Sequence, residues 1–524
     1  MTSEPTATQS TSPRADAHAG AGGDGRRVVV MGAGPAGLTA AWELTRAGVP
    51  VEVLEADPET VGGIARTASY KGFRFDIGGH RFFTKADDVR VVWHEILDDD
   101  DWLTVPRLSR IYYNGRFFQY PLRAFDALRK LGLATSVLCV LSYGKAKAFP
   151  RKPENSFEDW IVNRFGNRLF SIFFKTYTEK VWGMPCSEIS ADWAAQRIKG
   201  LSLVEAVKNA VLASRGGAGK KNGEVIKTLI EEFEYPKYGP GMMWERATEQ
   251  VRAAGNDVHM GERVVGIRHA GGRVCEVLVD ASDGSKAYAG TDFISTLPIR
   301  DLVGMIDPTP PQQVIEAANA LRYRDFLTVV LVVDRPDLFP DNWIYIHDPA
   351  VHLGRVQNFK NWSPFMVPDP SQTALGLEYF CTEGDTLWEM DDDALRALGS
   401  REIARIGLAR PEEIVDGTTV RMRKAYPVYD EHYRDNVATV WGWIRDNLRN
   451  LQLVGRNGMH KYNNQDHSMM TAMLAARNLL GEQWDPWNVN TDAEYHEEAG
   501  EDHDTAGRLL PQRLTAGQGT DDAA

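Results

Sequence analysis

Cysteine is scarce in this chain: only four occur among 524 residues, at Cys139, Cys186, Cys275 and Cys381. They lie far apart and form no metal-ligand spacing, so the sequence implies no metal site. The N-terminus also lacks a basic start followed by an apolar run, the pattern of a secretory signal. We therefore expect a reducing, cytoplasmic setting.

A long hydrophobic run is missing as well. The most apolar window, LGLATSVLCVL at 131–141, is too short to cross a bilayer as a helix. Its ordinary interpretation is a helix buried in the protein, and contact with a membrane surface is the alternative. No transmembrane segment is expected.

An excess of basic charge is also absent, since the formal net charge is −13. Residues 488–524 carry nine acidic and two basic side chains, and residues 1–25 carry three and one, so most of the acidity lies in the ends. This balance argues against nucleic acid as a partner. Both ends contain few large apolar residues, so we predict a disordered tail over 1–25 and an acidic, disordered tail over 488–524.

A glycine-rich junction follows the first predicted strand. The sequence GAGPAG at 32–37 lies between the apolar run 28–31 and a helix pattern that stops at Gly48, and a second strand ends at Glu55. In a dinucleotide-binding fold the first glycine permits a tight turn, the second admits the pyrophosphate and the third lets helix and strand pack closely. Glu55 would then accept hydrogen bonds from a ribose. The alternative is a structural glycine turn. The candidate cofactor contacts here are Gly32, Gly34, Pro35, Ala36, Gly37 and Glu55.

A second glycine motif favours FAD over NAD. Gly62-Gly63 followed by Arg66 is similar to the loop that closes over the diphosphate in FAD-binding oxidoreductases, and such a clamp suits a retained flavin. FDIGGH at 75–80 adds Gly79 and His80, where glycine lets the backbone approach a flat ring. A packed or surface histidine is the alternative for His80.

A polar stretch, GRNGMHKYNNQDHSMM at 455–470, follows the apolar strand LQLVG at 451–455. An apolar helix pattern continues from it, and a helix N-terminus favours negative charge, as on a reduced flavin. The alternative is an elaborate helix cap without a ligand. The candidate cofactor contacts in this stretch are Gly455, Gln465, Asp466 and Ser468, and the strand-rich return at 258–296 adds Val264.

These patterns predict an α/β fold with a discontinuous Rossmann-like (GR2-type) FAD-binding domain made of residues 26–90, 235–298 and 450–487. Residues 91–234 are predicted to form a mainly helical domain. Residues 299–449 are predicted to form a mixed, antiparallel-sheet substrate domain.

Five ordered motifs over about residues 27–480 resemble UDP-galactopyranose mutase, a family within the FAD-dependent amine oxidase and protoporphyrinogen oxidase superfamily. They are FDIGGHRFF, FFKTYTEKVWGMPCSEISADW, GRVQNFKNWSP, AYPVY and GRNGMHKYNNQDHS. The resemblance is strongest to the eukaryotic type of the family.

The resemblance implies a non-redox conversion of a nucleotide sugar from pyranose to furanose, in which N5 of reduced FAD is the nucleophile. Arg355 and Arg456 would hold the diphosphate, and Tyr426 and Tyr462 would donate hydrogen bonds to it. His80 would lie against the flavin. Trp182 would help to form the sugar site.

The substrate stays open at this point. The segment QYPLRAF has Leu122 and Arg123 where the family usually has an aromatic residue or Ile and then Gln-Asn, so another nucleotide or sugar is as compatible as UDP-galactose. A flavin oxidase or desaturase of the same superfamily is the alternative function, and a non-enzymatic flavin carrier is a third. A homo-oligomer is possible with any of them.

Overall fold

The computed structural model describes residues 25–120, 122, 124–191, 193 and 232–490. Residues 1–24 of the N-terminal tail predicted at 1–25, residues 491–524 of the tail predicted at 488–524, and Arg123 lie outside the described residues. Within these ranges, no helix has the length and apolar character that crossing a membrane requires.

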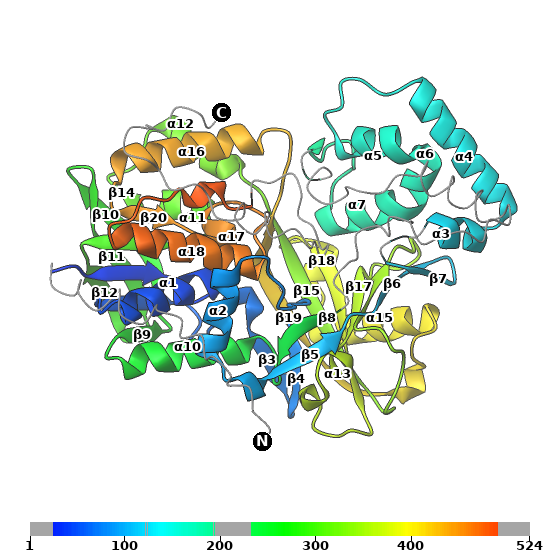
Figure 1. Cartoon of the computed structure of the whole chain (residues 1–524), viewed down its shortest axis with the longest axis horizontal. Helices are drawn as coiled ribbons and strands as arrows, with labels where there is room; N and C mark the ends of the chain where they lie inside the picture. The colour runs from blue at the N-terminus through cyan, green and yellow to red at the C-terminus, as the bar shows by residue number, and fades with distance from the viewer. Residues whose placement is uncertain (1–24, 121, 123, 192, 194–231, 491–524) are drawn as a thin grey trace, which may run out of the picture.

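A parallel sheet organises one side of the molecule (Figure 1). Within the described residues its strand order is β20-β13-β1-β2-β9, and every neighbouring pair is parallel. Three separate parts of the chain supply the strands, which confirms a discontinuous α/β fold. The strands are β1 (Val28–Met31), β2 (Val51–Glu55), β9 (Asp257–Met260), β13 (Asp292–Ser295) and β20 (Leu451–Leu453).

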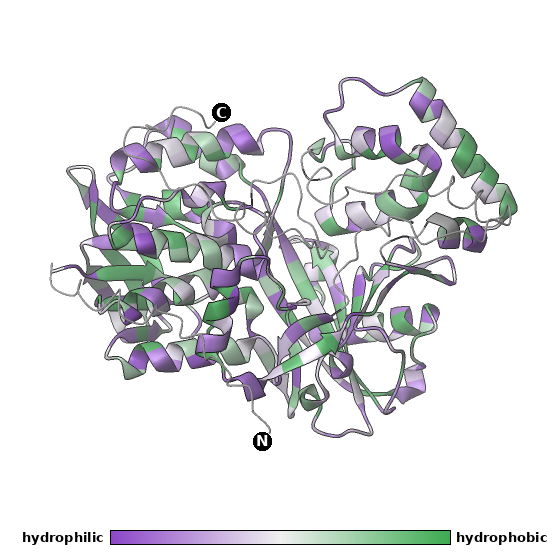
Figure 2. Ribbon diagram, viewed as in Figure 1, coloured by the Kyte–Doolittle hydropathy of each residue, from purple (hydrophilic) through white to green (hydrophobic). Residues whose placement is uncertain are grey.

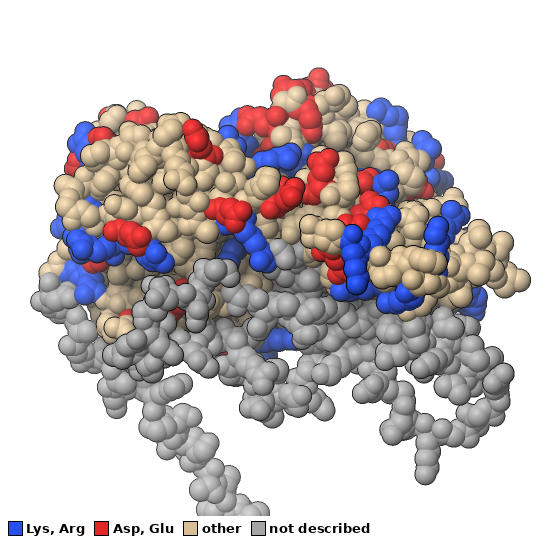
Figure 3. Space-filling model, turned by 90° about the horizontal axis from the view of Figure 1, so that it is seen from above, with Lys and Arg blue, Asp and Glu red and all other residues tan. Residues whose placement is uncertain are grey.

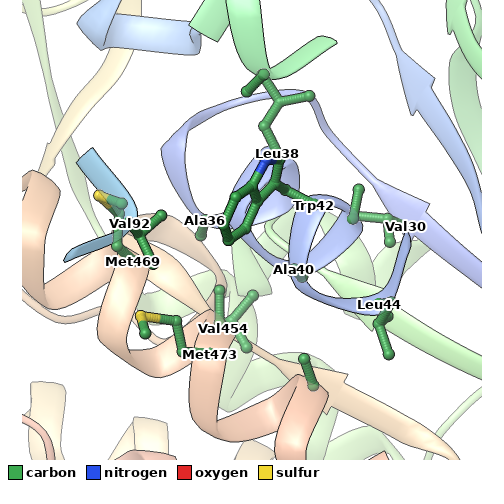
Figure 4. Packing of buried hydrophobic residues seen from close by; sticks show 14 of the residues in the cluster. Val30, Ala36, Leu38, Ala40, Trp42, Leu44, Val92, Val454, Met469 and Met473 are labelled. Carbon is green, nitrogen blue, oxygen red and sulfur yellow. The ribbon is translucent and has the colours of Figure 1, made fainter. Parts of the chain in front are cut away.

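Three helices cover one face of this sheet: α1 (Pro35–Arg46), α10 (Gly241–Ala253) and α18 (Gln465–Leu479). Figure 4 shows Trp42 and Ala36 of α1 among the apolar side chains of this core, with Met469 and Met473 of α18 nearby. Burial of α18 on most of its surface fixes its N-terminus close to the start of α1. This packing brings residues 34 and 465 into one region despite their separation in sequence.

The opposite face carries a second, small sheet and three helices. The helices α11 (Ile299–Gly304), α12 (Gln312–Ala320) and α16 (Tyr433–Asn447) belong to the range predicted as the substrate domain. They pack instead against the parallel sheet, because their apolar faces meet Met31, Phe293 and Leu451. The small sheet consists of β10 (Arg263–Ala270), β11 (Arg273–Ala281), β12 (Gly284–Ala289) and β14 (Ile306–Asp307).

A larger sheet lies beside the parallel one, in the order β19-β15-β18-β17-β16-β6-β7 among the described residues. Its strands are β19 (Ile414–Pro427), β15 (Tyr323–Val333), β18 (Thr373–Cys381), β17 (Arg355–Asn358), β16 (Trp343–Ile346), β6 (Ser109–Tyr113) and β7 (Arg116–Gln119). All neighbours are antiparallel except β16 and β6.

The hairpin of β6 and β7 turns at Asn114-Gly115, and both turn residues have positive φ. It lies within residues 91–234, the range predicted to be mainly helical. Because β6 pairs with β16, the hairpin extends the larger sheet. Residues 102–106 and 232–236 also form a strand pair, β5 (Trp102–Pro106) with β8 (Glu232–Pro236).

Helices do follow the hairpin: α3 (Ala124–Leu131), α4 (Leu133–Ala148), α5 (Phe157–Phe165), α6 (Asn167–Leu169) and α7 (Thr176–Trp182), with a π-helical turn at 170–175. Aromatic side chains form much of the core of this region: Phe157, Trp160, Phe165, Phe170 and Phe173 are buried. The interpretation of 131–141 as a buried helix was wrong: most large apolar side chains of α4 are exposed.

The first residues of the range predicted as an acidic tail, 488–490, are packed. Val489 is buried, and the Asn490 amide donates to the carbonyl of Tyr462 and to Asn463 Oδ1. These residues therefore support the polar stretch 455–464, and the rest of the range, 491–524, lies outside the described residues.

Candidate active site

The glycines of the first motif differ in how much room each leaves for a side chain. A Cβ on Gly32, which has φ of +100°, would lie 2.2 Å from Thr296 Oγ1, and one on Gly37 would lie 1.9 Å from the Gly32 carbonyl oxygen. A Cβ on Gly34 would approach only Gly63 Cα, at 4.0 Å. Two glycines therefore serve the packing of the chain itself, whereas Gly34 borders open space at the start of α1.

The two glycine motifs meet. The amide of Gly62 donates to the Ala33 carbonyl at 2.8 Å, and both Gly62 and Gly63 have positive φ. Pro35 is the first residue of α1, and Ala36 is buried behind the loop. The backbones of residues 32–37 and 62–63 thus form one cradle at a helix N-terminus, which suits a diphosphate.

Glu55 ends β2 beside this cradle. Its carboxylate accepts hydrogen bonds from the amides of Ala33, at 2.7 Å, and Asp57, at 2.9 Å. Burial raises the pKa of Glu55. A ribose that donates two hydroxyl hydrogen bonds to the remaining lone pairs would favour the ionised form. Arg66 lies near, bound through Nη1 to Asp57 at 2.9 Å.

The first residue of α18, Gln465, has a side-chain amide that lacks hydrogen-bond partners among the described residues. Among the described residues, both Nε2 and Oε1 of the Gln465 side chain are buried and have no hydrogen-bond partner. Buried amide atoms without a partner are costly, so they indicate a missing ligand. The helix is capped by Asn464 and His467, so Gln465 is not needed as a cap. Asp466 and Ser468 are buried in the first turn.

Gly455 and Val264 have different surroundings. Gly455 has φ of +82° and its Cβ would lie 3.0 Å from Ala36 Cβ, so it contacts the start of α1 directly. Val264 is buried on β10 in the cluster that includes Met31 and Leu54. It therefore lies near the ends of β1 and β2, away from Gln465.

Arg355 begins β17 opposite a buried carboxylate. Its Nε donates to Glu378 Oε2 at 2.6 Å, and the Glu378 side chain has no exposed surface. Glu378 also accepts a hydrogen bond from Gln357 Nε2 at 2.7 Å. Burial opposes the charge on Arg355, but Glu378 keeps its pKa above the usual value. Among the described residues only Nε of Arg355 is hydrogen-bonded, so its two terminal nitrogens are available to a ligand.

Arg456 lies beside a pair of stacked tyrosines. Its Cζ is 5.3 Å from the ring centre of Tyr426 and 5.5 Å from that of Tyr462, and the two rings are stacked with centres 5.6 Å apart. Its Nε and Nη1 donate to the carbonyls of Asn463 and Ala425. Main-chain bonds therefore hold the guanidinium in one position.

The positive charges of Arg355 and Arg456 both influence the pKa values of Tyr426 and His80. Burial raises the pKa of Tyr426, as does the neighbouring Tyr462, while both arginines oppose that rise. Burial, followed by the positive charges of Arg456 and Arg355, lowers the pKa of His80 from 6.5 to about 3. The two guanidinium groups and these rings therefore share one electrostatic environment.

His80 is neutral at physiological pH. Its Nδ1 lies 3.2 Å from the carbonyl oxygen of Gly78, which can only accept, so Nδ1 carries the proton and Nε2 is a free acceptor. Gly79, before it, is close to Gln357 and Trp362, where a Cβ would lie 2.9 Å from Gln357 Nε2. The FDIGGH loop is thus held against β17.

Trp182 ends α7 and meets Tyr462 edge-on, with ring centres 6.0 Å apart. Within the described residues its buried indole nitrogen has no hydrogen-bond partner. The structure therefore brings Trp182, Tyr426, Arg456 and Tyr462 into one cluster. His80 and Arg355 adjoin that cluster through the charges described above.

Sequence reasoning missed three residues beside Arg355. Glu378 is one, and its signal was a carboxylate within the apolar strand sequence TALGLEYF, where an ion needs a partner. Tyr345 is another, with its ring centre 5.9 Å from Arg355 Cζ. Tyr177 packs edge-on against Tyr345 and is stacked on His347. No local signal distinguishes these tyrosines from core aromatics.

A family model described as "Flavin containing amine oxidoreductase" matches residues 35–434. The match covers most of the chain, and the chain belongs to this family. Short segments are similar to an L-glutamate oxidase precursor of Streptomyces viridosporus (51% identity over 55 residues) and to an L-amino-acid oxidase of Crotalus adamanteus (49% over 65). These segments cover 10% and 12% of this chain, and 7% and 12% of the two relatives.

Solved structures resemble the whole fold. Reduced UDP-galactopyranose mutase has a TM-score of 0.73 with 23% identity, over 87% of this chain and 96% of that one. A putative protoporphyrinogen oxidase from Exiguobacterium sp. 255-15 has a TM-score of 0.65 with 16% identity, over 87% and 99%. A putrescine oxidase variant has 0.56 with 17% identity, over 87% and 99%. The chain is thus a flavoprotein of the amine oxidase superfamily with a fold like that of UDP-galactopyranose mutase.

The cofactor is FAD, and the residues of the site fit it. Gly34 leaves open space where a diphosphate needs close approach, and the Gln465 amide lacks the partners that a flavin ring could supply. Glu55 offers a carboxylate to a ribose between the two glycine motifs. The cradle lies at the N-terminus of α1 and Gln465 at the N-terminus of α18, so two helix starts and both glycine motifs are placed to contact one dinucleotide.

Proposed function

We propose that this protein is a flavin-dependent pyranose–furanose mutase that acts on a nucleotide sugar such as UDP-galactopyranose, with no net redox change. The observation that carries the proposal is the meeting of Arg355 and Arg456 around Tyr426. Two fixed guanidinium groups suit a diphosphate, which carries two negative charges and presents pairs of oxygen atoms that a planar guanidinium can bind with two hydrogen bonds. An amine or an amino acid has no need of both.

Reduced FAD would supply a nucleophilic nitrogen, N5, to the anomeric carbon of the sugar. The protein's part is to bind and stabilise the departing nucleoside diphosphate. The terminal nitrogens of Arg355 would bind one phosphate. Arg456, beside the stacked tyrosines, would bind the other. Both charges act on an oxyanion whose negative charge grows as the bond to the sugar breaks, which lowers the barrier.

Tyr426 and Tyr462 would donate phenolic hydrogen bonds to the same phosphates. Burial and mutual proximity raise the pKa of Tyr426, so its proton stays in place while it donates. His80 is neutral, and among the described residues its Nε2 has no hydrogen-bond partner. This nitrogen would accept a hydrogen bond from a sugar hydroxyl or from the cofactor. Trp182 would exclude water from the sugar beside Tyr462.

The test is turnover under anaerobic conditions. The purified protein is reduced with dithionite, mixed with a panel of nucleotide sugars, and the products are separated by chromatography and identified by NMR. A mutase gives many turnovers per flavin while the flavin spectrum stays reduced. Failure of every nucleotide sugar, together with no binding of nucleoside diphosphates by calorimetry, would contradict the proposal.

An oxidase is the second candidate, and the stacked pair of Tyr426 and Tyr462 favours it, since parallel aromatic rings can hold an amine or an apolar substrate. The same protein, with oxidised flavin and in air, is supplied with amines and amino acids. An oxidase bleaches its flavin on addition of substrate and releases peroxide. A mutase does neither, so the two experiments separate the functions.

A further inference from the structure

Helix α4 (Leu133–Ala148) has its large apolar side chains on the outside. Cys139 and Ala146 face the protein and are buried, whereas exposed fractions on the outer side range from 43% at Val140 to 84% at Leu133. The spacing of residues 133, 137, 140 and 141 places them on one face of the helix. Phe149, directly after the helix, is 78% exposed.

This apolar surface is concentrated in one place. Within the described part of the chain, twelve large hydrophobic side chains are exposed, and six of them fall within residues 133–149. Figure 1 places α4 at the outer edge of the helical region, and Figure 2 shows hydrophobic residues along much of it. Soluble proteins rarely expose a continuous apolar patch of this kind unless it binds something.

Basic side chains surround the patch. Residues 124–153 contain six Lys and Arg but one acid, a net of +5 in a chain whose net charge is −13. Lys130 is paired with Asp126, and Arg151 with Glu158. The other four, Arg129, Lys145, Lys147 and Lys152, form no ion pair with the described residues. Figure 3 shows blue side chains gathered at the end of the molecule that holds this region, next to uncharged surface.

We propose that α4 is a membrane-docking helix, which lies on an anionic lipid surface with its outer apolar face among the acyl chains and its lysines near the headgroups. A helix of 16 residues extends about 24 Å along such a surface. Apolar burial together with attraction between lysine and anionic lipid is what holds interfacial helices.

A second copy of the chain would be a less suitable partner. Two such surfaces would bring equal positive charges together around the apolar contact, and like charges that face each other are unfavourable. An anionic membrane complements both the apolar face and the charge. None of the α4 residues named above belongs to the candidate active site, so membrane docking is independent of the proposed function.

The test is sedimentation of the full-length, FAD-loaded protein with vesicles. We expect binding to vesicles with roughly one-third phosphatidylglycerol, weaker binding to pure phosphatidylcholine, and release by salt. The double variants Leu138→Ser/Leu141→Ser and Lys145→Glu/Lys147→Glu should each lower the binding at least about tenfold. Because all four side chains are exposed, flavin content and unfolding temperature should stay unchanged.

The matched control is Val91→Ser/Val415→Ser, which removes two exposed valines elsewhere and should bind like the unchanged protein. Light scattering of each variant measures self-association in parallel. Three results would overturn the proposal: no binding to anionic vesicles, equal binding by the double variants, or self-association that Leu138→Ser/Leu141→Ser abolishes. The last would assign α4 to contact with a second copy.

Discussion

The cofactor cradle and the arginine–tyrosine cluster are built in opposite ways. The cradle uses main-chain atoms and the absence of side chains, at Gly34 and Gly63, within about thirty residues of continuous sequence. The cluster uses long side chains from α7, β17, β19, α17 (Gly455–Gly458) and the loop before α18. The first site is therefore sensitive to added atoms, and the second to removed charges.

The largest effect is expected where a removed charge leaves its partner buried. Arg355→Ala should destabilise the protein by about 3–5 kcal/mol, because the fully buried Glu378 would lose its cation. Chemical unfolding measures the difference. Arg355→Ala/Glu378→Gln should recover much of the stability, since the neutral amide can still accept from Gln357. A double variant no more stable than Arg355→Ala would show that the pair is not the cause.

The next largest effect is expected where a methyl group is added to a glycine of the cradle. Gly37→Ala should cost about 3 kcal/mol of folding stability, since its Cβ would lie 1.9 Å from a carbonyl oxygen. Gly34→Ala has room in the protein alone, so the flavin-free protein should keep its stability while FAD affinity falls at least about tenfold. Calorimetry measures the folding stability, and flavin fluorescence measures the FAD affinity. Equal losses of stability in both variants would contradict the distinction.

A substitution of Arg456 tests the cluster without leaving a buried carboxylate unpaired, because this arginine donates to main-chain carbonyls. If it binds the diphosphate, Arg456→Ala should weaken nucleoside diphosphate binding by about 2–3 kcal/mol while FAD stays bound. Titration calorimetry gives the affinity, and Arg268→Ala, which removes an exposed arginine from β10, is the control. Unchanged affinity in Arg456→Ala would remove this residue from the proposed site.

The smallest effect concerns the histidine beside the cluster. Burial, and then the positive charge of Lys180, lowers the pKa of His347 from 6.5 to about 3. The unfolded chain therefore takes up a proton first, and stability falls as the pH drops from 6.5 towards 3. At pH 5 the loss from this group is about 1–2 kcal/mol. His347→Phe keeps a ring against Tyr177 and should flatten this part of the pH profile, measured by unfolding at pH 7 and pH 5. An unchanged slope would contradict the assignment.

The domain boundaries show a limit of sequence reasoning. The hairpin at 109–119 turns at Asn114-Gly115, a pair that favours such a turn locally, yet its membership of the larger sheet depends on pairing with β16, more than 230 residues later. The helices α11, α12 and α16 likewise belong by sequence range to one domain and by packing to another. Residues 131–141 gave the same difficulty, since an apolar sequence does not say which side of a helix meets the protein.

The sequence by itself determined the parts that depend on local backbone geometry: the glycine turn of β1 and α1, the acid at the end of β2, and the final strand and helix. These follow from φ angles, strand and helix periods and close main-chain approach, which neighbouring residues control. Only the tertiary structure decided that Glu378 holds Arg355 and that Arg456 lies beside the stacked rings of Tyr426 and Tyr462. It also decided that α4 turns its apolar face outward. Side-chain contacts between distant strands depend on how sheets and helices pack, and that packing follows from the whole chain.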